Sequence, residues 1–170
     1  MEPYKVLTFP DPFLKTIAKP VAVFDEELKE IADRMIVTMY ESGGIGLAAI
    51  QVGIDKRMFV MDVSYSKEMP ESDRNPTVII NPEIEEKGQA ALGEEGCLSV
   101  PEFRADVKRA SEIVLRYKDL NGEQQELEAD GMMAICIQHE TDHLNGKLFI
   151  DYLPPLQRNM IRKKLKKMAG

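Results

Sequence analysis

The chain has 170 residues, a formal net charge of −7 and 44% hydrophobic residues, which is enough for one compact domain with a sizeable core. Its longest apolar run has six residues and its N-terminus lacks the pattern of a secretory signal, so we expect a cytoplasmic protein without a membrane partner. The two cysteines are too few for a disulfide framework, so each is a candidate ligand, nucleophile or core residue.

The first clear helix is predicted to begin at Asp25. Apolar residues recur at three- and four-residue steps from Leu28 to Met39, and Ser42-Gly43-Gly44 ends the pattern. This spacing indicates a helix that faces the core.

A glycine-rich segment, residues 44–53, follows this helix and contains the G-x-G-x-x-A pattern. A dinucleotide-binding turn follows a strand and opens a helix, whereas this segment follows a helix and leads toward an extended run. The context therefore disfavours a nucleotide site and leaves a plain tight turn as the structural alternative. Gln51 offers an amide N–H donor beside a backbone that is free to approach a substrate.

Extended runs are predicted at residues 57–63, 77–84 and 111–117, and the last of these pairs with residues 123–130 across an Asn121-Gly122 turn. The polar stretch 64–75 reads as a surface loop. Strands and helices do not alternate as a parallel sheet requires, which favours antiparallel pairing.

The only two histidines, His139 and His143, lie four residues apart in an H-E-x-x-H pattern. On a helix such positions differ by about 40° around the axis and about 6 Å along it, so both imidazoles can bind one metal ion. The carboxylate of Glu140 then stands beside the ion, where it can take a proton from a bound water. The spacing therefore specifies two ligands and a base.

This helix is predicted to run from about 131 to 145, between a candidate N-cap at Asp130 and an Asn145-Gly146 stop. The apolar run Met132–Ile137 indicates that it is largely buried, where unpaired polar groups are costly. This favours a metal site over two core histidines with ordinary hydrogen bonds. We predict an α+β fold with mostly antiparallel strands around this central metal-binding helix and with a C-terminal helix, in a single domain spanning residues 1–170.

The charge is uneven, since residues 152–170 carry six basic residues and no acidic one, which leaves −13 on the rest of the chain. Pro154 and Pro155 precede a nearly helical apolar stripe, which predicts an amphipathic C-terminal helix. The stripe consists of Leu156, Met160, Ile161, Leu165 and Met168. Two interpretations stay open: a basic surface that binds phosphate, or a solvated helix docked on an acidic body.

A catalytic site of this kind needs a third protein ligand and an open position for water. One zinc endopeptidase class uses a third histidine where this chain has Phe149, and another uses a later glutamate, but none follows Glu140. An H-E-x-x-H metallo-endopeptidase is thus the disfavoured alternative. Cys136 lies about 10.5 Å from His143 along the helix axis, too far for one ion to bridge. The predicted third ligand is therefore Cys97.

Cys97 lies in the segment E-E-G-C-L-S, residues 94–99. The glycine lets the backbone approach an ion closely, with the thiolate and the N–H of Leu98 both aimed at it. A buried structural thiol is the alternative for Cys97 alone. A structural zinc domain is the alternative for the whole group, but no fourth ligand is evident.

Three segments, in this order, resemble the signature motifs of peptide deformylases: G-I-G-L-A-A-I-Q at 44–51, E-G-C-L-S at 95–99 and Q-H-E-T-D-H-L at 138–144. The resemblance covers nearly the whole chain. It implies removal of the formyl group from the N-terminal formylmethionine of newly synthesised bacterial polypeptides, with release of formate.

The resemblance also implies the site residues. Cys97, His139 and His143 would hold one Fe(II) ion, although these ligand types suit zinc, and zinc, nickel or cobalt could replace the iron. Glu140 would act as base and then as acid. The side-chain amide of Gln51 would receive the charge that develops on the formyl oxygen.

The N–H of Leu98 would be the second donor to that oxygen. The methionine pocket would be formed by Ile45, Gly46, Glu95, Ile135 and Cys136, with Arg104 in contact with the peptide backbone. The basic C-terminal helix resembles the element by which bacterial deformylases dock on the ribosome. No sequence-specific binding of nucleic acid is implied.

Overall fold

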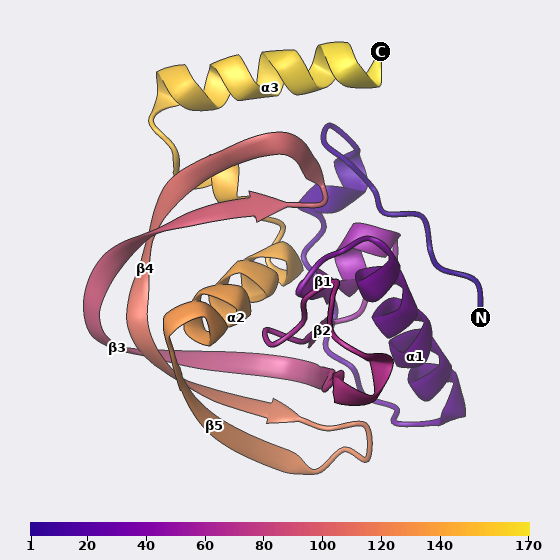
Figure 1. The fold of residues 1–170 in the computed structure, drawn as a ribbon. Helices are drawn as coiled ribbons and strands as arrows, with labels where there is room; N and C mark the ends of the chain where they lie inside the picture. The colour runs from indigo at the N-terminus through magenta and orange to yellow at the C-terminus, as the bar shows by residue number, and fades with distance from the viewer.

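The computed structural model describes residues 1–170, and a curved antiparallel sheet in it wraps around one central helix (Figure 1). The helices are α1 (Glu26–Glu41), α2 (Gly131–Leu144) and α3 (Pro155–Ala169). The strands are β1 (Gly46–Ala48), β2 (Met58–Met61), β3 (Thr77–Cys97), β4 (Val100–Lys118) and β5 (Gln124–Asp130). This architecture confirms the α+β fold predicted from the sequence.

The sheet follows the chain order β1-β2-β3-β4-β5, and every neighbouring pair is antiparallel. β4 and β5 form the predicted hairpin, with Gly122 of the turn at a φ of +78°. β3 and β4 continue well beyond the predicted runs. The sequence did not indicate this, because residues 85–92 of β3 are exposed and show no apolar face. Register shifts bend this long ribbon so that it curls around α2 (Figure 1).

The helix ends follow local signals, with one exception. α1 begins where the Asp25 carboxylate accepts a hydrogen bond from the N–H of Leu28 at 3.0 Å. α2 begins at Gly131, whose φ of +52° lets β5 turn directly into the helix. Asp130 is the N-cap residue, as predicted, although its side chain makes no capping hydrogen bond. The helix ends at Leu144, as expected from the stop that follows it.

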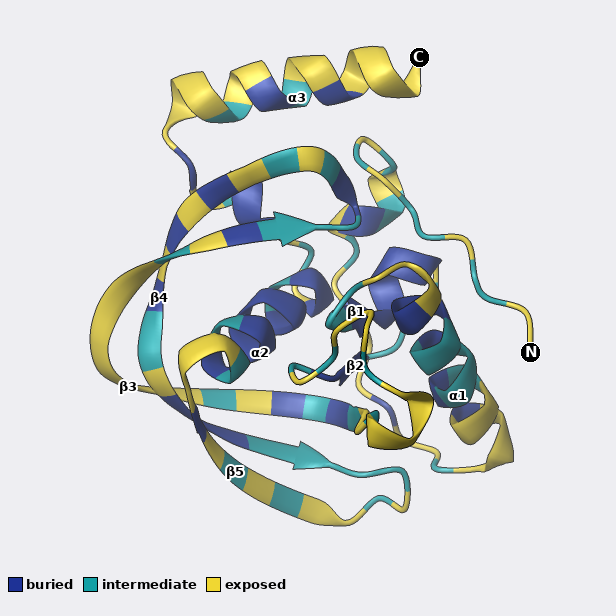
Figure 2. Ribbon diagram, viewed as in Figure 1, coloured by how far each residue is buried: buried dark blue, intermediate teal, exposed yellow.

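The core surrounds α2, which is buried along most of its length (Figure 2). Its apolar side chains, among them Ile137 and Leu144, pack with residues of β2, β3 and β4 in one cluster. A second cluster joins α1 to β1 and β2. Met132 departs from the predicted burial because it lies in the first turn of α2, where its side chain is 61% exposed.

α3 lies along one edge of the molecule and packs on it through Ile161 and Leu165 (Figures 1 and 2). The other members of the predicted stripe, Leu156, Met160 and Met168, are exposed, because the helix contacts the body along a single row four residues apart. The expected amphipathic helix is thus present with a narrower apolar face. None of the helices combines the length and the apolar composition that a membrane crossing needs.

Candidate active site

α2 places its two imidazoles side by side, one turn apart. The Nε2 atoms of His139 and His143 lie 3.2 Å from each other, and the Nε2 of His143 lies 3.4 Å from the Sγ of Cys97. All three ligand atoms fall within 4.8 Å of one another. The structure therefore brings together the three residues that the sequence predicted as metal ligands.

Cys97 reaches α2 because it stands at the tip of the β3–β4 ribbon. Cys97 pairs with Val100 across a two-residue turn, and the register shift beside Gly96 changes the direction of the strand there. The N–H of Ser99 in the turn points at the sulfur, with the nitrogen 3.4 Å from Sγ. Leu98 is the other residue of the turn, next to the sulfur in the chain.

The three atoms fit a metal ion. For metal bonds of about 2.0 Å to nitrogen and about 2.3 Å to sulfur, tetrahedral geometry sets the nitrogens about 3.3 Å apart and nitrogen and sulfur about 3.5 Å apart. The observed 3.2 Å and 3.4 Å are close to both values. The buried Nδ1 of His143 has no hydrogen-bond partner, and burial lowers the pKa of this imidazole, which favours its neutral, metal-binding form.

Glu95 fixes the orientation of His139. Its Oε1 lies 2.8 Å from the Nδ1 of His139, so this nitrogen carries the proton and the opposite nitrogen keeps its lone pair for a ligand bond. Glu95 borders the cavity, as the family resemblance implies, but its side chain is only 3% exposed. Burial alone would raise the pKa of Glu95, but hydrogen bonds from Arg109 and His139 outweigh burial and lower it.

Glu140 lies between the histidines in sequence and faces the cavity. It is 5% exposed, and its Oε1 has no hydrogen-bond partner. Burial raises the pKa of this carboxyl to about 7. A carboxyl group with a pKa near neutrality can both accept and return a proton.

Gln51 is held with its donor end toward Cys97. Its Oε1 accepts a hydrogen bond from the N–H of Ala48 at 2.9 Å, which leaves the amide nitrogen on the other side. That nitrogen lies 3.1 Å from the Oγ of Ser99 and 3.5 Å from the Sγ of Cys97. The 3₁₀ turn at Ala49–Val52, directly after β1, sets this orientation.

A cavity of about 850 Å³ opens beside these residues. Its wall includes every residue that the resemblance assigned to substrate binding: Ile45, Gly46, Glu95, Arg104, Ile135 and Cys136. The lining also includes Phe103 and Met132, which the sequence analysis did not identify. Arg104 stands at the rim, ion-paired with Glu94 at 2.6 Å, with both side chains more than half exposed.

Arg109, a buried arginine of β4 that binds Glu95 and Asp142, was not among the residues predicted from the sequence. A signal for it exists, because Ala105, Val107 and Arg109 follow the two-residue period of a strand and all three point inward. An arginine in the buried phase of a strand needs acidic partners. This pattern was not recognised because the predicted strand began only at residue 111, two residues after Arg109.

Comparisons with known proteins agree on one family. The model of the polypeptide deformylase family matches residues 3–159. The chain is 51% identical to the peptide deformylase of Alkalilimnicola ehrlichii over 164 residues, which covers 96% of this chain and 89% of that protein.

Solved structures give the same result. The crystal structure of a peptide deformylase from Legionella pneumophila matches with a TM-score of 0.90 and 43% identity, covering 99% of this chain and 96% of that one. The peptide deformylase of Ehrlichia chaffeensis in complex with actinonin matches with a TM-score of 0.91 and 38% identity, covering 99% and 98% of the two chains.

Proposed function

The chain belongs to the peptide deformylase family, and on this premise we propose how its residues carry out the reaction. The enzyme removes the N-formyl group from newly synthesised peptides. The observation that carries the proposed mechanism is the arrangement of one thiol and two imidazoles, with an unpartnered buried carboxyl at their side. The disfavoured endopeptidase lacks support both from the family and from the cysteine in the ligand group.

Cys97, His139 and His143 hold one ion in this proposal, and the fourth position is left for water or substrate, since the group contains three protein ligands. When bound, the ion acidifies a water molecule and polarises the formyl carbonyl. We propose Fe(II) as the native ion on the strength of the family resemblance. The ligand types also suit zinc, nickel and cobalt.

Glu140 moves the protons. Its carboxylate takes a proton from the attacking water and then delivers it to the departing amine of methionine. The free Oε1 of Glu140 and its burial beside the ligand group support this role. Negative charge that develops on the formyl oxygen is stabilised by the amide of Gln51 and the N–H of Leu98. The donor end of Gln51 supports its part, because that end faces Cys97.

Methionine is selected by the apolar part of the 850 Å³ cavity, where Ile135 and Cys136 lie one turn before the ligands on α2. Ile45 and Gly46 line the same cavity, and Arg104 at the rim contacts the backbone of the following residues. This cavity is also the place where we expect actinonin to bind, since actinonin is bound in the Ehrlichia chaffeensis enzyme.

The test is formate release from formyl-Met-Ala-Ser. We expect release from this peptide, no acetate from acetyl-Met-Ala-Ser, loss of activity with a metal chelator, and recovery when Fe(II) is added under anaerobic conditions. Cleavage of an unblocked protein substrate would instead support the endopeptidase. Failure to release formate with Fe(II), zinc, nickel or cobalt would overturn the proposed function.

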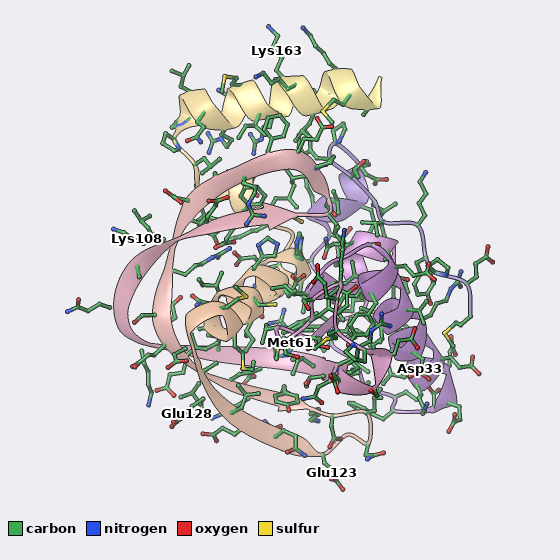
Figure 3. All side chains as sticks on the ribbon, in the orientation of Figure 1. Asp33, Met61, Lys108, Glu123, Glu128 and Lys163 are labelled. Atoms are coloured by element: carbon green, nitrogen blue, oxygen red, sulfur yellow. The ribbon has the colours of Figure 1, made fainter.

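Because the substrates are newly synthesised peptides, we further propose that the enzyme, a single domain, acts in the cytoplasm near the ribosome. Lysines of α3 such as Lys163 point away from the body and offer a basic surface (Figure 3). Changing Lys163 and Lys164 to glutamine should reduce co-sedimentation with ribosomes at low salt. Glutamine at Lys87 and Lys108, exposed lysines of the ribbon, is the matched control. Equal co-sedimentation of both variants would contradict docking through α3.

A further inference from the structure

The guanidinium of Arg109 joins two carboxylates behind the metal site. It donates two hydrogen bonds to Glu95, from Nε at 2.7 Å and from Nη2 at 2.9 Å. Its Nη1 donates a third, to the Oδ2 of Asp142 at 2.6 Å. The side chains of Arg109 and Glu95 are 6% and 3% exposed, and that of Asp142 is 17% exposed, so the cluster is shielded from water.

These contacts tie together the two parts of the chain that supply the ligands. Glu95 stands two residues before Cys97 on β3, whereas Asp142 stands directly before His143 on α2. Only one other ion pair joins β3 to α2, the bond between Glu95 and His139. One side chain from β4 thus fixes the separation between the cysteine and the histidine pair.

Glu95 also connects Arg109 to the third ligand. Its Oε1 accepts from both Arg109 and the Nδ1 of His139, at 2.9 Å and 2.8 Å. A buried carboxylate is stable only while its charge and its lone pairs are satisfied. Without the guanidinium, Glu95 would lose the partner that holds it in the geometry that orients His139.

We propose that Arg109 is a positioning residue that preorganises the metal site through Glu95 and Asp142. It does not line the 850 Å³ cavity, and its side-chain hydrogen bonds go to Glu95 and Asp142 rather than to the three ligand residues. Fixing the ligands in place before the ion arrives lowers the cost of ordering them on binding. The inference rests on the proposed metal site and adds the residue that holds its two halves in register.

Arg109 also stands between Glu95 and a second cavity. Arg109 and Asp142 line a second cavity of about 810 Å³, on the side of the cluster away from substrate, while Glu95 and His139 line the first. The Tyr152 ring covers the guanidinium, with its centroid 5.0 Å from the central carbon. A smaller side chain at position 109 would open a path for water from the second cavity to Glu95.

The test compares Arg109→Lys with Arg57→Met as the control, a larger change at an arginine outside the cluster. Lysine keeps the charge but cannot make three bonds in the same fork geometry. Arg57 also binds the end of α2, through Asn145 at 3.0 Å, and the carbonyl of Pro82 at 2.9 Å, but it touches neither Glu95 nor Asp142. The two arginines therefore differ in the contact that the proposal invokes.

The readouts are Co(II) affinity, measured by competition with a chelating dye, the thiolate absorption bands of the bound Co(II), and the melting temperature of the metal-free protein. Arg109→Lys should weaken Co(II) binding about 10- to 100-fold and shift those bands, whereas Arg57→Met should retain wild-type affinity and spectrum. Asp142→Asn, which leaves Arg109 and Glu95 paired, should weaken binding by a smaller factor and provides a second variant if the first does not fold.

The outcomes separate this inference from the proposed function. Wild-type Co(II) affinity and spectrum in both Arg109→Lys and Asp142→Asn would overturn the role of Arg109 alone. An equal loss of Co(II) affinity in Arg57→Met would overturn it too. So would a loss of affinity in Arg109→Lys that is explained by the fraction of unfolded protein. If the wild-type chain itself bound no metal ion, the proposed site would fail, and the inference with it.

Discussion

Gly46 and Glu140 meet at a distance that leaves no room for a side chain on the glycine. A β-carbon built on Gly46 would lie 2.7 Å from the Oε2 of Glu140 and 3.0 Å from the Sγ of Cys136. The G-I-G motif therefore has a steric reason at its second glycine: the proposed base occupies the space of the missing side chain.

The first prediction is that Gly46→Ala displaces Glu140 and lowers kcat/KM for formyl-Met-Ala-Ser. A shift of a reacting group by about 1 Å costs about 10²-fold in rate, while the metal content should remain at the wild-type level. Gly44→Ala is the control, because a β-carbon there would meet the end of the Leu98 side chain at 3.2 Å and the carbonyl oxygen of Gly46 at 3.5 Å, but not Glu140. Wild-type kinetics in Gly46→Ala would show that Glu140 has space to move or is not the base.

The second prediction concerns Gln51, whose two ends have different partners. Gln51→Glu keeps an oxygen for the N–H of Ala48 but replaces the amide donor with an acceptor. We expect kcat to fall about 10²- to 10³-fold, as for the loss of one oxyanion donor, with little change in KM. Ser99→Ala removes the other partner of that nitrogen and should cost much less. A loss confined to KM would assign Gln51 to substrate binding instead.

The ligands could be predicted from the sequence because the rules that place them are local or exclusive. The four-residue spacing of His139 and His143 brings two imidazoles together on any helix. Cys97 was then identified by elimination, since no third histidine or later glutamate is present. The pocket residues came from the family resemblance. Their side-chain directions, such as that of Glu95 toward His139, depend on the curl of the ribbon and could not be predicted from the sequence.

The third prediction separates the two cysteines. Cys97→Ser should lose bound metal during dialysis against a chelator, because a hydroxyl is a poor substitute for a thiolate ligand. Cys136→Ser should keep it, although Cys136 borders the same cavity, because its sulfur is not in the ligand group. Metal per chain, measured by atomic spectroscopy, decides the outcome. Equal retention by both variants would remove Cys97 from the ligand set.

What the sequence could not provide was long-range pairing. Because residues 85–92 are exposed, the continuation of β3 could not be recognised. The matching part of β4, on which Arg109 points inward, was therefore missed as well. For α3, periodicity predicted a helix correctly but overestimated its buried face, because Leu156 and Met160 match the spacing yet have no surface to pack against. In both cases the missing information was the position of another part of the chain.

Asp62 anchors both ends of the loop that follows β2. Its carboxylate accepts hydrogen bonds from the Tyr40 hydroxyl at 2.6 Å, the Ser64 hydroxyl at 2.7 Å and the N–H of Asn75 at 2.9 Å. Burial alone would raise the pKa of Asp62, but these hydrogen bonds together outweigh it and lower the pKa below its usual value. The ionised form of Asp62 therefore stabilises the folded chain.

The fourth prediction follows from the sign of that shift. A carboxyl group with a lowered pKa in the folded state contributes its full stability above its unfolded pKa of about 3.9, and loses it as the pH falls through the lower folded value. Asp62→Asn should therefore lower the free energy of unfolding by about 2 kcal/mol at pH 7, as for a hydrogen bond to a charged group. The difference from wild type should shrink below about pH 4.

Urea unfolding of the metal-free protein at pH 7, 5 and 3 measures this difference without a contribution from metal release. Asp73→Asn is the control, because Asp73 is exposed in the same loop and its substitution removes the same charge. We expect it to change stability by less than about 0.5 kcal/mol at each pH. A stability difference between wild type and Asp62→Asn that is as large at pH 3 as at pH 7 would mean that the charge of Asp62 contributes nothing. The loop would then be held by the shape of the side chain alone.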